Sequence, residues 1–186
     1  DKDRLSFDHC ILATGSQPIC PPLFSEIGDR ILTSTSALEL EDVPERLLVV
    51  GGGYIGLEMG TVYSSLGSQV SVVEMTGDLL TGVDRDLVRP LFTRLKSQFH
   101  NIYLNTKVVS CELKDNRIEV QFDGDAKTSS YDRVLVAVGR KPNTVDIGLE
   151  STGVKTDGHG FIQVNERFQT DESSIFAIGD VIGGAM

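Results

Sequence analysis

A chain of 186 residues, 40% of them hydrophobic, is long enough to bury one substantial core, and its composition is ordinary for a globular protein. The formal net charge of −10 argues against a nucleic-acid ligand, because binding to phosphate backbones depends on Lys and Arg. No apolar stretch approaches the length of a membrane span, and no signal peptide opens the chain, so we expect no membrane association.

The first half of the chain alternates short apolar runs with helical patterns. We predict a strand at 47–50, a helix at 54–66 that stops at Gly67-Ser68, and a strand at 70–74. A second helix is predicted at 84–99, although an interior Pro90 costs about 3 kcal/mol and favours a kink or a later start. Its apolar stripe has helical spacing and comprises Leu87, Val88, Leu91, Phe92, Leu95 and Phe99.

From Ile102 onward the pattern changes to short strands with turn signals. Three strands, predicted at 107–113, 117–122 and 131–138, make an antiparallel meander with a tight turn at Asp115-Asn116. Residues 141–171 are rich in turn formers, with one strand predicted at 161–164, and a last strand at 175–178 runs into Gly179-Asp180. These elements predict an α/β fold, a Rossmann-like three-layer dinucleotide-binding domain with a parallel sheet and an antiparallel three-stranded meander.

A glycine-rich turn joins the first strand to the first helix. Gly51 permits the tight turn, Gly53 lets a pyrophosphate approach bare backbone, and Gly56 lets helix and strand lie close together. The free N–H groups at the helix start then face the anion. Glu74 ends the next strand about twenty positions later, where its carboxylate can accept hydrogen bonds from the adenosine ribose hydroxyls. This context predicts a dinucleotide site.

Glu74 also indicates which nicotinamide cofactor binds. A 2′-phosphate would lie against this carboxylate, and like charges 4 Å apart repel by about 4 kcal/mol at an effective dielectric of 20. The residues that follow, 75–78, contain no Arg or Lys to offset the repulsion. We therefore predict NAD(H) rather than NADP(H).

Cysteine and histidine residues give no sign of a disulfide framework or a metal centre. The cysteines are not spaced as pairs, and we expect free thiols, which suit a reducing cytoplasm: Cys10, Cys20 and Cys111. No histidine has a carboxylate or Cys partner at ligand spacing, so no metal site is assigned to His9, His100 or His159.

An internal repeat suggests a second, incomplete domain. Residues 7–18 resemble residues 131–142, since each copy runs from an aromatic-Asp pair through an apolar strand to Gly-x-x-Pro. The later copy closes the domain that opens at Gly51, so the earlier copy should close a similar domain whose own opening is absent. Because the chain starts at Asp1 without Met, we expect an excised piece of a longer protein.

Four motifs stand in order along the chain: Ala13-Thr14-Gly15, Gly51–Glu58, Val138–Asn143 and Phe176–Asp180. Together they resemble the pyridine nucleotide–disulfide oxidoreductase family, flavoproteins with two dinucleotide domains. Within that family, segments 56–63, 66–70 and 73–75 are similar to bacterial dihydrolipoamide dehydrogenases, the flavoprotein subunit of 2-oxoacid dehydrogenase complexes and of the glycine cleavage system.

The resemblance implies domains and roles. Residues 1–18 would end an FAD-binding domain, 19–171 would form the NAD-binding domain, and 172–186 would return to the first. NAD would be bound by Gly51, Gly52, Gly53, Tyr54, Ile55, Gly56, Glu58, Glu74, Val108, Ala137, Val138, Gly139 and Arg140. FAD would be contacted by Thr14, Gly15, Ser16 and Asp180, the last through the ribityl chain.

Glu58 has two explanations. An acid near a helix N-terminus complements the macrodipole by about 0.3–1 kcal/mol. In the family it also pairs with a Lys beside the redox disulfide, and since that Lys is absent here we expect Glu58 to face solvent.

The resemblance further implies a homodimeric parent enzyme that oxidises dihydrolipoyl groups on lipoyl domains and passes electrons through a disulfide and FAD to NAD⁺. This chain has no C-x-x-x-x-C pair, no first FAD fingerprint and no His-Glu base. We therefore assign it no catalytic residue and expect it to be inactive alone.

Other readings of the sequence stay open. An aromatic residue at Tyr54 resembles glutathione reductases more than many dihydrolipoamide dehydrogenases, where an aliphatic residue is expected. Ordinary helix-to-sheet packing would also explain it. The parent could instead be a soluble transhydrogenase or a mercuric or glutathione reductase, and the chain could be a non-catalytic NAD-binding module that senses redox state.

Overall fold

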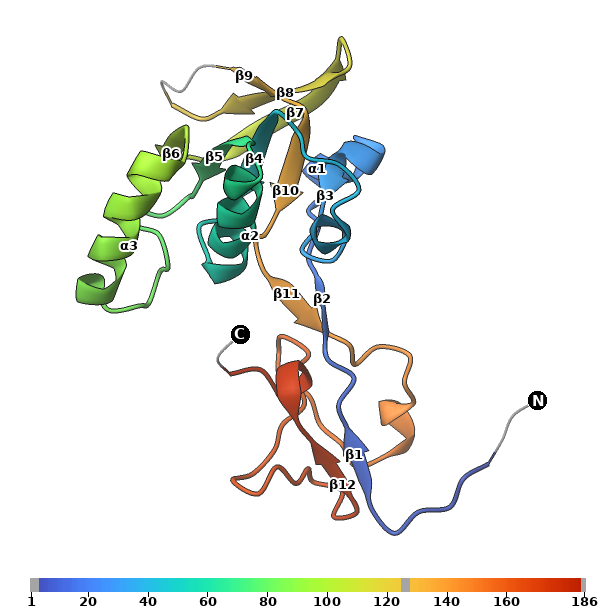
Figure 1. Ribbon diagram of the computed structural model, residues 1–186. Coiled ribbons are helices and arrows are strands. Elements are labelled where there is room, and N and C mark those ends of the chain that lie inside the picture. The colour runs from blue at the N-terminus through green and yellow to red at the C-terminus, as the bar shows by residue number, and fades with distance from the viewer. Residues whose placement is uncertain (1–3, 125–127, 185–186) are drawn as a thin grey trace. The chain divides into compact units, whose positions relative to one another are not determined.

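A computed structural model describes residues 4–124 and 128–184 (Figure 1). The chain divides into two compact units. We call Pro18–Gly139 the central unit, and the described residues before and after it the terminal unit. The chain passes from one unit to the other after Gln17 and again after Gly139.

The central unit is built on a five-stranded parallel sheet in the order β3-β10-β4-β5-β6. These strands are Ile31–Leu32, Arg133–Val136, Arg46–Val50, Gln69–Val73 and Asn101–Tyr103. In β4 and β5, four of the five residues are buried, as expected for inner parallel strands covered on both faces.

Side-chain alternation along β4 separates two cores. Leu47 and Val49 face helices α2 (Tyr54–Ser65) and α3 (Arg85–Gln98), whose Leu57 and Leu95 lie in the same cluster. The intervening residues of β4 pack toward the meander instead. The meander consists of β7 (Val108–Lys114), β8 (Arg117–Phe122) and β9 (Ser129–Tyr131), and Figure 1 shows it on the face opposite the two helices. The predicted three-layer α/β fold is confirmed.

Strand β10 leaves the meander for the parallel sheet. The predicted strand 131–138 is therefore two strands, β9 paired with β8 and β10 paired with β4, separated by Asp132. The Asp132 carboxylate accepts a hydrogen bond from the Arg46 amide at 2.8 Å and so fixes this break. Three short helices lie in the segment before β4: α1 (Pro22–Ser25), η1 (Gly28–Arg30) and η2 (Ser36–Glu39).

Helix α3 runs without interruption through Pro90. It begins at Arg85, one residue later than the predicted start, and the Asp84 carboxylate caps it by accepting from the Asp86 amide at 3.2 Å. One member of the predicted apolar stripe also lies outside the core, because Leu87 is 71% exposed. Val88 and Leu95 are buried as predicted.

The terminal unit contains two small sheets. β1 (Cys10–Leu12) pairs in parallel with β12 (Ile175–Ala177), and β2 (Ser16–Pro18) pairs with β11 (Arg140–Pro142). Two short helices complete it, η3 (Leu149–Ser151) and η4 (Gly179–Ile182). The strand predicted at 161–164 is reduced to an isolated bridge between Ile162 and Thr156.

The boundaries of the two compact units differ from the predicted domain boundaries. Residues 140–171, expected to belong with the glycine-rich turn, cluster with the two ends of the chain. The two repeat copies have matching local structure, since each contains a strand, a glycine with positive φ (Gly15 at 70°, Gly139 at 137°) and a second short strand. Which cofactor each unit binds stays a prediction.

Candidate functional site

The glycine-rich turn, here called the elbow (Gly51–Gly56), links β4 to α2. Gly51 has a φ of 109°, and a Cβ built there would lie 2.3 Å from the Ala137 carbonyl oxygen at the end of β10. A Cβ on Gly56 would lie 2.3 Å from the Gly51 carbonyl oxygen. Both glycines are therefore required by close backbone packing, which agrees with the roles predicted for them.

Gly53 differs from these two glycines. It is the N-cap of α2 with φ −77° and ψ 173°, and a Cβ built there would meet nothing within 4 Å. No side chain caps the first turn of α2. The elbow thus presents an open, uncapped helix N-terminus whose N–H dipoles favour an anion.

The carboxylate of Glu74 reaches the elbow directly. Its Oε2 accepts a hydrogen bond from the Gly52 amide at 2.7 Å. Its Oε1 accepts from the Thr76 amide at 2.8 Å and from the Thr76 hydroxyl at 2.9 Å. Since a carboxylate has about four lone-pair sites, three protein donors leave it capacity for a further donor.

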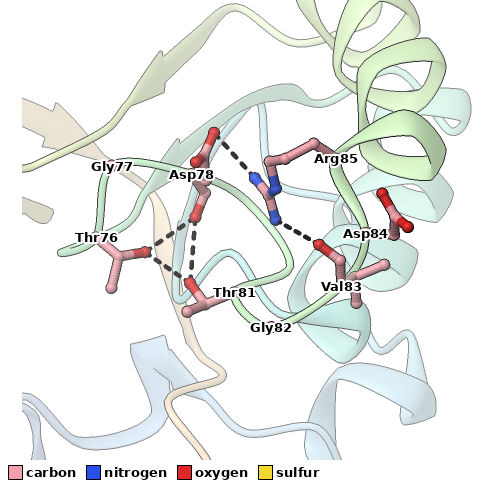
Figure 2. Close-up of a pocket in the computed structure, with 8 residues that line it drawn as sticks. All are labelled: Thr76, Gly77, Asp78, Thr81, Gly82, Val83, Asp84 and Arg85. Atoms are coloured by element: carbon pink, nitrogen blue, oxygen red, sulfur yellow. Dashed lines mark hydrogen bonds and ion pairs between the residues drawn. The ribbon is translucent and has the colours of Figure 1, made fainter.

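The loop after β5 folds back against the elbow. Its Leu80 amide donates to the Gly52 carbonyl at 2.9 Å, and Leu79 is 1% exposed. A Cβ on Gly52 would lie 2.6 Å from Leu79 Cδ2, so Gly52 too is held close to its surroundings. This loop holds a pocket with a volume of about 690 Å³. Figure 2 shows the residues that line it: Thr76, Gly77, Asp78, Thr81, Gly82, Val83, Asp84 and Arg85.

Arg85 closes this loop from the start of α3. Its Nη1 lies 3.0 Å from Asp78 Oδ1, and its Nη2 donates to the Val83 carbonyl at 3.0 Å (Figure 2). Nη2 also donates to the Leu80 carbonyl at 3.2 Å. The expectation that no basic residue lies near Glu74 was drawn from residues 75–78 alone. The tertiary structure brings an arginine into the same loop, already paired with an acid.

Other residues predicted to bind NAD lie around the elbow and at the ends of the strands. Tyr54 and Val138 are each 44% exposed, and Glu58 is exposed one turn of α2 beyond Tyr54, as expected. Ala137 donates its amide to the Val50 carbonyl at 2.8 Å, which holds the end of β10 beside the elbow. Val108 packs against the core on the meander side of the sheet.

The predicted flavin residues lie together in the terminal unit. The Ser16 hydroxyl donates to Asp180 Oδ2 at 2.7 Å, and the Thr14 hydroxyl donates to the Asn143 carbonyl at 2.8 Å. Arg140 joins this group, since its Nε donates to the Ser16 hydroxyl at 2.6 Å and lies 3.8 Å from Asp180 Oδ2. The residue predicted for the nicotinamide side is thus bonded to residues predicted for the flavin.

Sequence reasoning missed three polar residues of these two clusters. Thr76 stands two residues after Glu74 and could have been found as a local hydroxyl donor. Arg85 carries no local signal, because its contacts depend on a loop that folds back. Asn143 lies in a motif, but its contact with Thr14 depends on a strand pair. Among the described residues, no group of three potential ligands is arranged for a metal ion. No helix in the described ranges is long and apolar enough to cross a membrane.

The chain resembles proteins of known sequence along its whole length. It is 46% identical over 185 residues to the dihydrolipoyl dehydrogenase of Vibrio parahaemolyticus serotype O3:K6, an alignment that covers 98% of this chain and 39% of the relative. It is 44% identical to the Haemophilus influenzae dihydrolipoyl dehydrogenase, covering 98% of this chain and 38% of that protein. The chain therefore spans about two fifths of the length of these relatives.

Solved structures have the same fold. The HOCl-induced flavoprotein disulfide reductase RclA of Escherichia coli, in a Cu(II) complex, superposes with a TM-score of 0.86 at 31% identity, covering 95% of this chain and 40% of that one. LpdA of Mycobacterium tuberculosis superposes with a TM-score of 0.85 at 29% identity, covering 96% and 39%. The family model described as pyridine nucleotide-disulphide oxidoreductase matches residues 1–186. The chain belongs to the pyridine nucleotide-disulphide oxidoreductase family.

Proposed function

We propose that the central unit binds NAD(H), with the pyrophosphate at the elbow and the adenosine ribose at Glu74. The observation that carries this proposal is the 2.7 Å hydrogen bond between the Glu74 carboxylate and the Gly52 amide. It joins the acid that would recognise the ribose to the turn that would hold the phosphates. Residues 22 positions apart in sequence thereby form one site.

Different residues around the elbow would bind different parts of the cofactor. The uncapped amides at the start of α2 would receive the pyrophosphate oxygens, and the empty space beside Gly53 would let them approach. Val108 would lie near the adenine. The nicotinamide side would be lined by Tyr54, Ile55 and Glu58 of α2 and by the residues that follow β10, Ala137, Val138 and Gly139. Arg140 is the first residue of β11, and its predicted nicotinamide role depends on whether its guanidinium leaves Ser16.

The terminal unit fits a part of a flavin site. Ser16 and Arg140 both contact the Asp180 carboxylate and fix one of its oxygens, so the other can accept from a ribityl hydroxyl. Thr14 and Gly15 lie at the turn between β1 and β2, close to this group. FAD, when bound, would supply electron transfer between a dithiol and the nicotinamide. The residues present here would only position it.

For the whole protein we propose dihydrolipoyl dehydrogenase activity, the oxidation of dihydrolipoyl groups with reduction of NAD⁺. The relatives at 46% and 44% identity bear that name. Lipoyl domains, a 2-oxoacid dehydrogenase complex and a second copy of the protein are the partners this activity implies. A reducing, cytoplasmic setting is consistent with the three free cysteines. The chain by itself should not reduce lipoamide with NADH, since it holds no redox cysteine pair.

A second candidate is another disulfide reductase of the same family. It is favoured by the exposed aromatic ring of Tyr54 and by the structural likeness to the RclA reductase. Both candidates require a nicotinamide cofactor at the elbow, and they differ in the substrate of the parent protein.

Calorimetric titration of the 186-residue chain with NADH and NADPH tests the proposal. We expect NADH to bind more tightly than NADPH, because Glu74 would repel the 2′-phosphate. A Glu74→Gln change should weaken NADH binding about tenfold or more, the effect of losing a hydrogen bond to a charged group. Glu112→Gln, on the exposed strand β7, is the matched control and should leave the affinity unchanged. NADPH binding as tight as NADH would contradict the cofactor assignment.

A further inference from the structure

The pocket beside Glu74 contains one cationic side chain among the eight described residues that line it, Arg85. An arginine next to an adenosine ribose ordinarily favours a 2′-phosphate, because its guanidinium binds phosphate oxygens in a fork. The pocket therefore holds the group that NADP(H) would need. The contacts of Arg85 determine whether its guanidinium is free to bind a 2′-phosphate.

Asp78 is the acidic neighbour that forms an ion pair with Arg85. Its Oδ1 lies 3.0 Å from Arg85 Nη1 (Figure 2), and the Asp78 and Arg85 side chains are 63% and 38% exposed, so the pair is partly open to solvent. Nη1 makes no hydrogen bond among the described residues, so the contact is an ion pair without hydrogen-bond geometry. The guanidinium is thus neutralised by Asp78 at Nη1, which is buried, while its Nη2 is held by the loop carbonyls.

The same loop links this ion pair to Glu74. The Thr76 hydroxyl lies 2.9 Å from Glu74 Oε1 and 2.9 Å from the Asp78 carbonyl oxygen. It is also 2.8 Å from the Thr81 hydroxyl. Glu74, Thr76, Asp78 and Arg85 are thus consecutive members of one chain of contacts. A charge change at Asp78 therefore acts two contacts away from Glu74, through Thr76.

We infer that Asp78 is a second specificity-determining residue: by pairing with Arg85, it keeps this cation from binding the 2′-phosphate of NADP(H). Glu74 repels the phosphate directly, and Asp78 removes the attraction that Arg85 would supply. The inference rests on the proposed function, since it assumes that the adenosine ribose lies at Glu74. It predicts that removing Glu74 alone does not create an NADPH site.

Four variants of the 186-residue chain test this inference by titration with NADH and NADPH. In Glu74→Gln the repulsion is gone but Arg85 is still paired, so NADPH binding should improve only slightly. Adding Asp78→Asn should tighten NADPH binding about tenfold relative to Glu74→Gln, an effect of the size expected for one released ionic contact to phosphate. NADH binding should change less than twofold between these two variants. Because the new contact is ionic, the gain should shrink as salt is raised.

The other two of the four variants separate the release of Arg85 from a general change of charge. Adding Arg85→Gln to the double variant should cancel the gain in NADPH affinity, with thermal melts confirming that the loop still folds. Replacing Asp78→Asn by Asp84→Asn removes the same charge from the same pocket, but Asp84 caps α3 and Asn is an equally good cap. This matched control should give no gain.

The outcomes distinguish the two levels of the proposal. An NADPH gain that survives Arg85→Gln, or that Asp84→Asn reproduces, would overturn the role of Asp78. Equal effects of Asp78→Asn on NADH and NADPH would overturn it as well. If the unmodified chain does not bind NADH at all, the proposed function itself fails, whatever the variants show.

Discussion

Gly53→Ala is the change that most sharply separates binding from folding at the elbow. Gly53 has φ −77° and ψ 173°, a conformation open to alanine, and a Cβ there would meet no protein atom within 4 Å. The methyl group would instead occupy the space that a pyrophosphate needs in order to reach the amides of α2. This change should leave the folded structure intact but weaken cofactor binding.

The expected stability change is small because two effects offset each other. Replacing glycine by alanine lowers the conformational entropy of the unfolded chain and stabilises by about 0.4–1 kcal/mol. Alanine is a poorer N-cap than glycine by a similar amount, about 0.5–1 kcal/mol. The free energy of unfolding should therefore stay within about 0.5 kcal/mol of the original. The dissociation constant for NADH should rise at least about tenfold, which corresponds to 1.4 kcal/mol.

Gly56→Ala is the contrasting change. Alanine would gain about 1 kcal/mol of helix propensity. Its Cβ would lie 2.3 Å from the backbone oxygen of Gly51, and such an overlap forces a backbone shift that costs about 1–3 kcal/mol or more. The steric cost outweighs the propensity, so this variant should be less stable as well as weaker in binding.

Thermal and urea denaturation give the stabilities, and quenching or enhancement of NADH fluorescence gives the affinities. Gly158→Ala is a suitable control, because that glycine also has empty surroundings but lies in the terminal unit. An unchanged NADH affinity in Gly53→Ala would refute the placement of the pyrophosphate at the elbow. A Gly56→Ala variant as stable as the original would refute the close packing on which the elbow depends.

Two further predictions concern stability. Pro90→Ala should raise the free energy of unfolding by about 1–3 kcal/mol, because it restores an N–H inside an unbroken helix and removes a ring that crowds the Asp86 carbonyl; unchanged urea midpoints would contradict this. Burial raises the pKa of the Cys111 thiol from 9.0 to about 11, so the unfolded chain ionises first and stability should fall as the pH rises from 9 to 11. Urea titrations of Cys111→Val across this range should show a shallower fall, and parallel curves would count against the reasoning.

Much of the central unit follows from local sequence signals. The strand at 47–50, the helix from Tyr54 and the hairpin around Asp115-Asn116 were all predicted within about one residue, because apolar periodicity, glycine positions and turn residues act locally. The elbow and its acid were also predicted from spacing alone. Hydrophobic alternation in β4 explains why the sheet has a covered face on each side.

Errors arose where a contact distant in sequence overrode the local pattern. The apolar run at 131–138 reads as one strand, but the Arg46 amide bonds to Asp132 and divides it between two sheets. Leu87 has the spacing of a core residue but is exposed, because only part of α3 faces the sheet. The pairing of β2 with β11 also joins segments far apart in sequence, and the domain boundary at residue 171 stays a prediction.

By itself the sequence determined the fold class, the glycine elbow and Glu74 as the acid that follows it, because each depends on residue type at short spacing. Only the tertiary structure decided which side chains surround that acid. The loop after β5 folds back on Gly52, and this return places Arg85 in one pocket with Thr76, whose hydroxyl contacts Glu74. Hydrogen bonds and ion pairs form between atoms a few ångströms apart, and a linear pattern does not encode such distances.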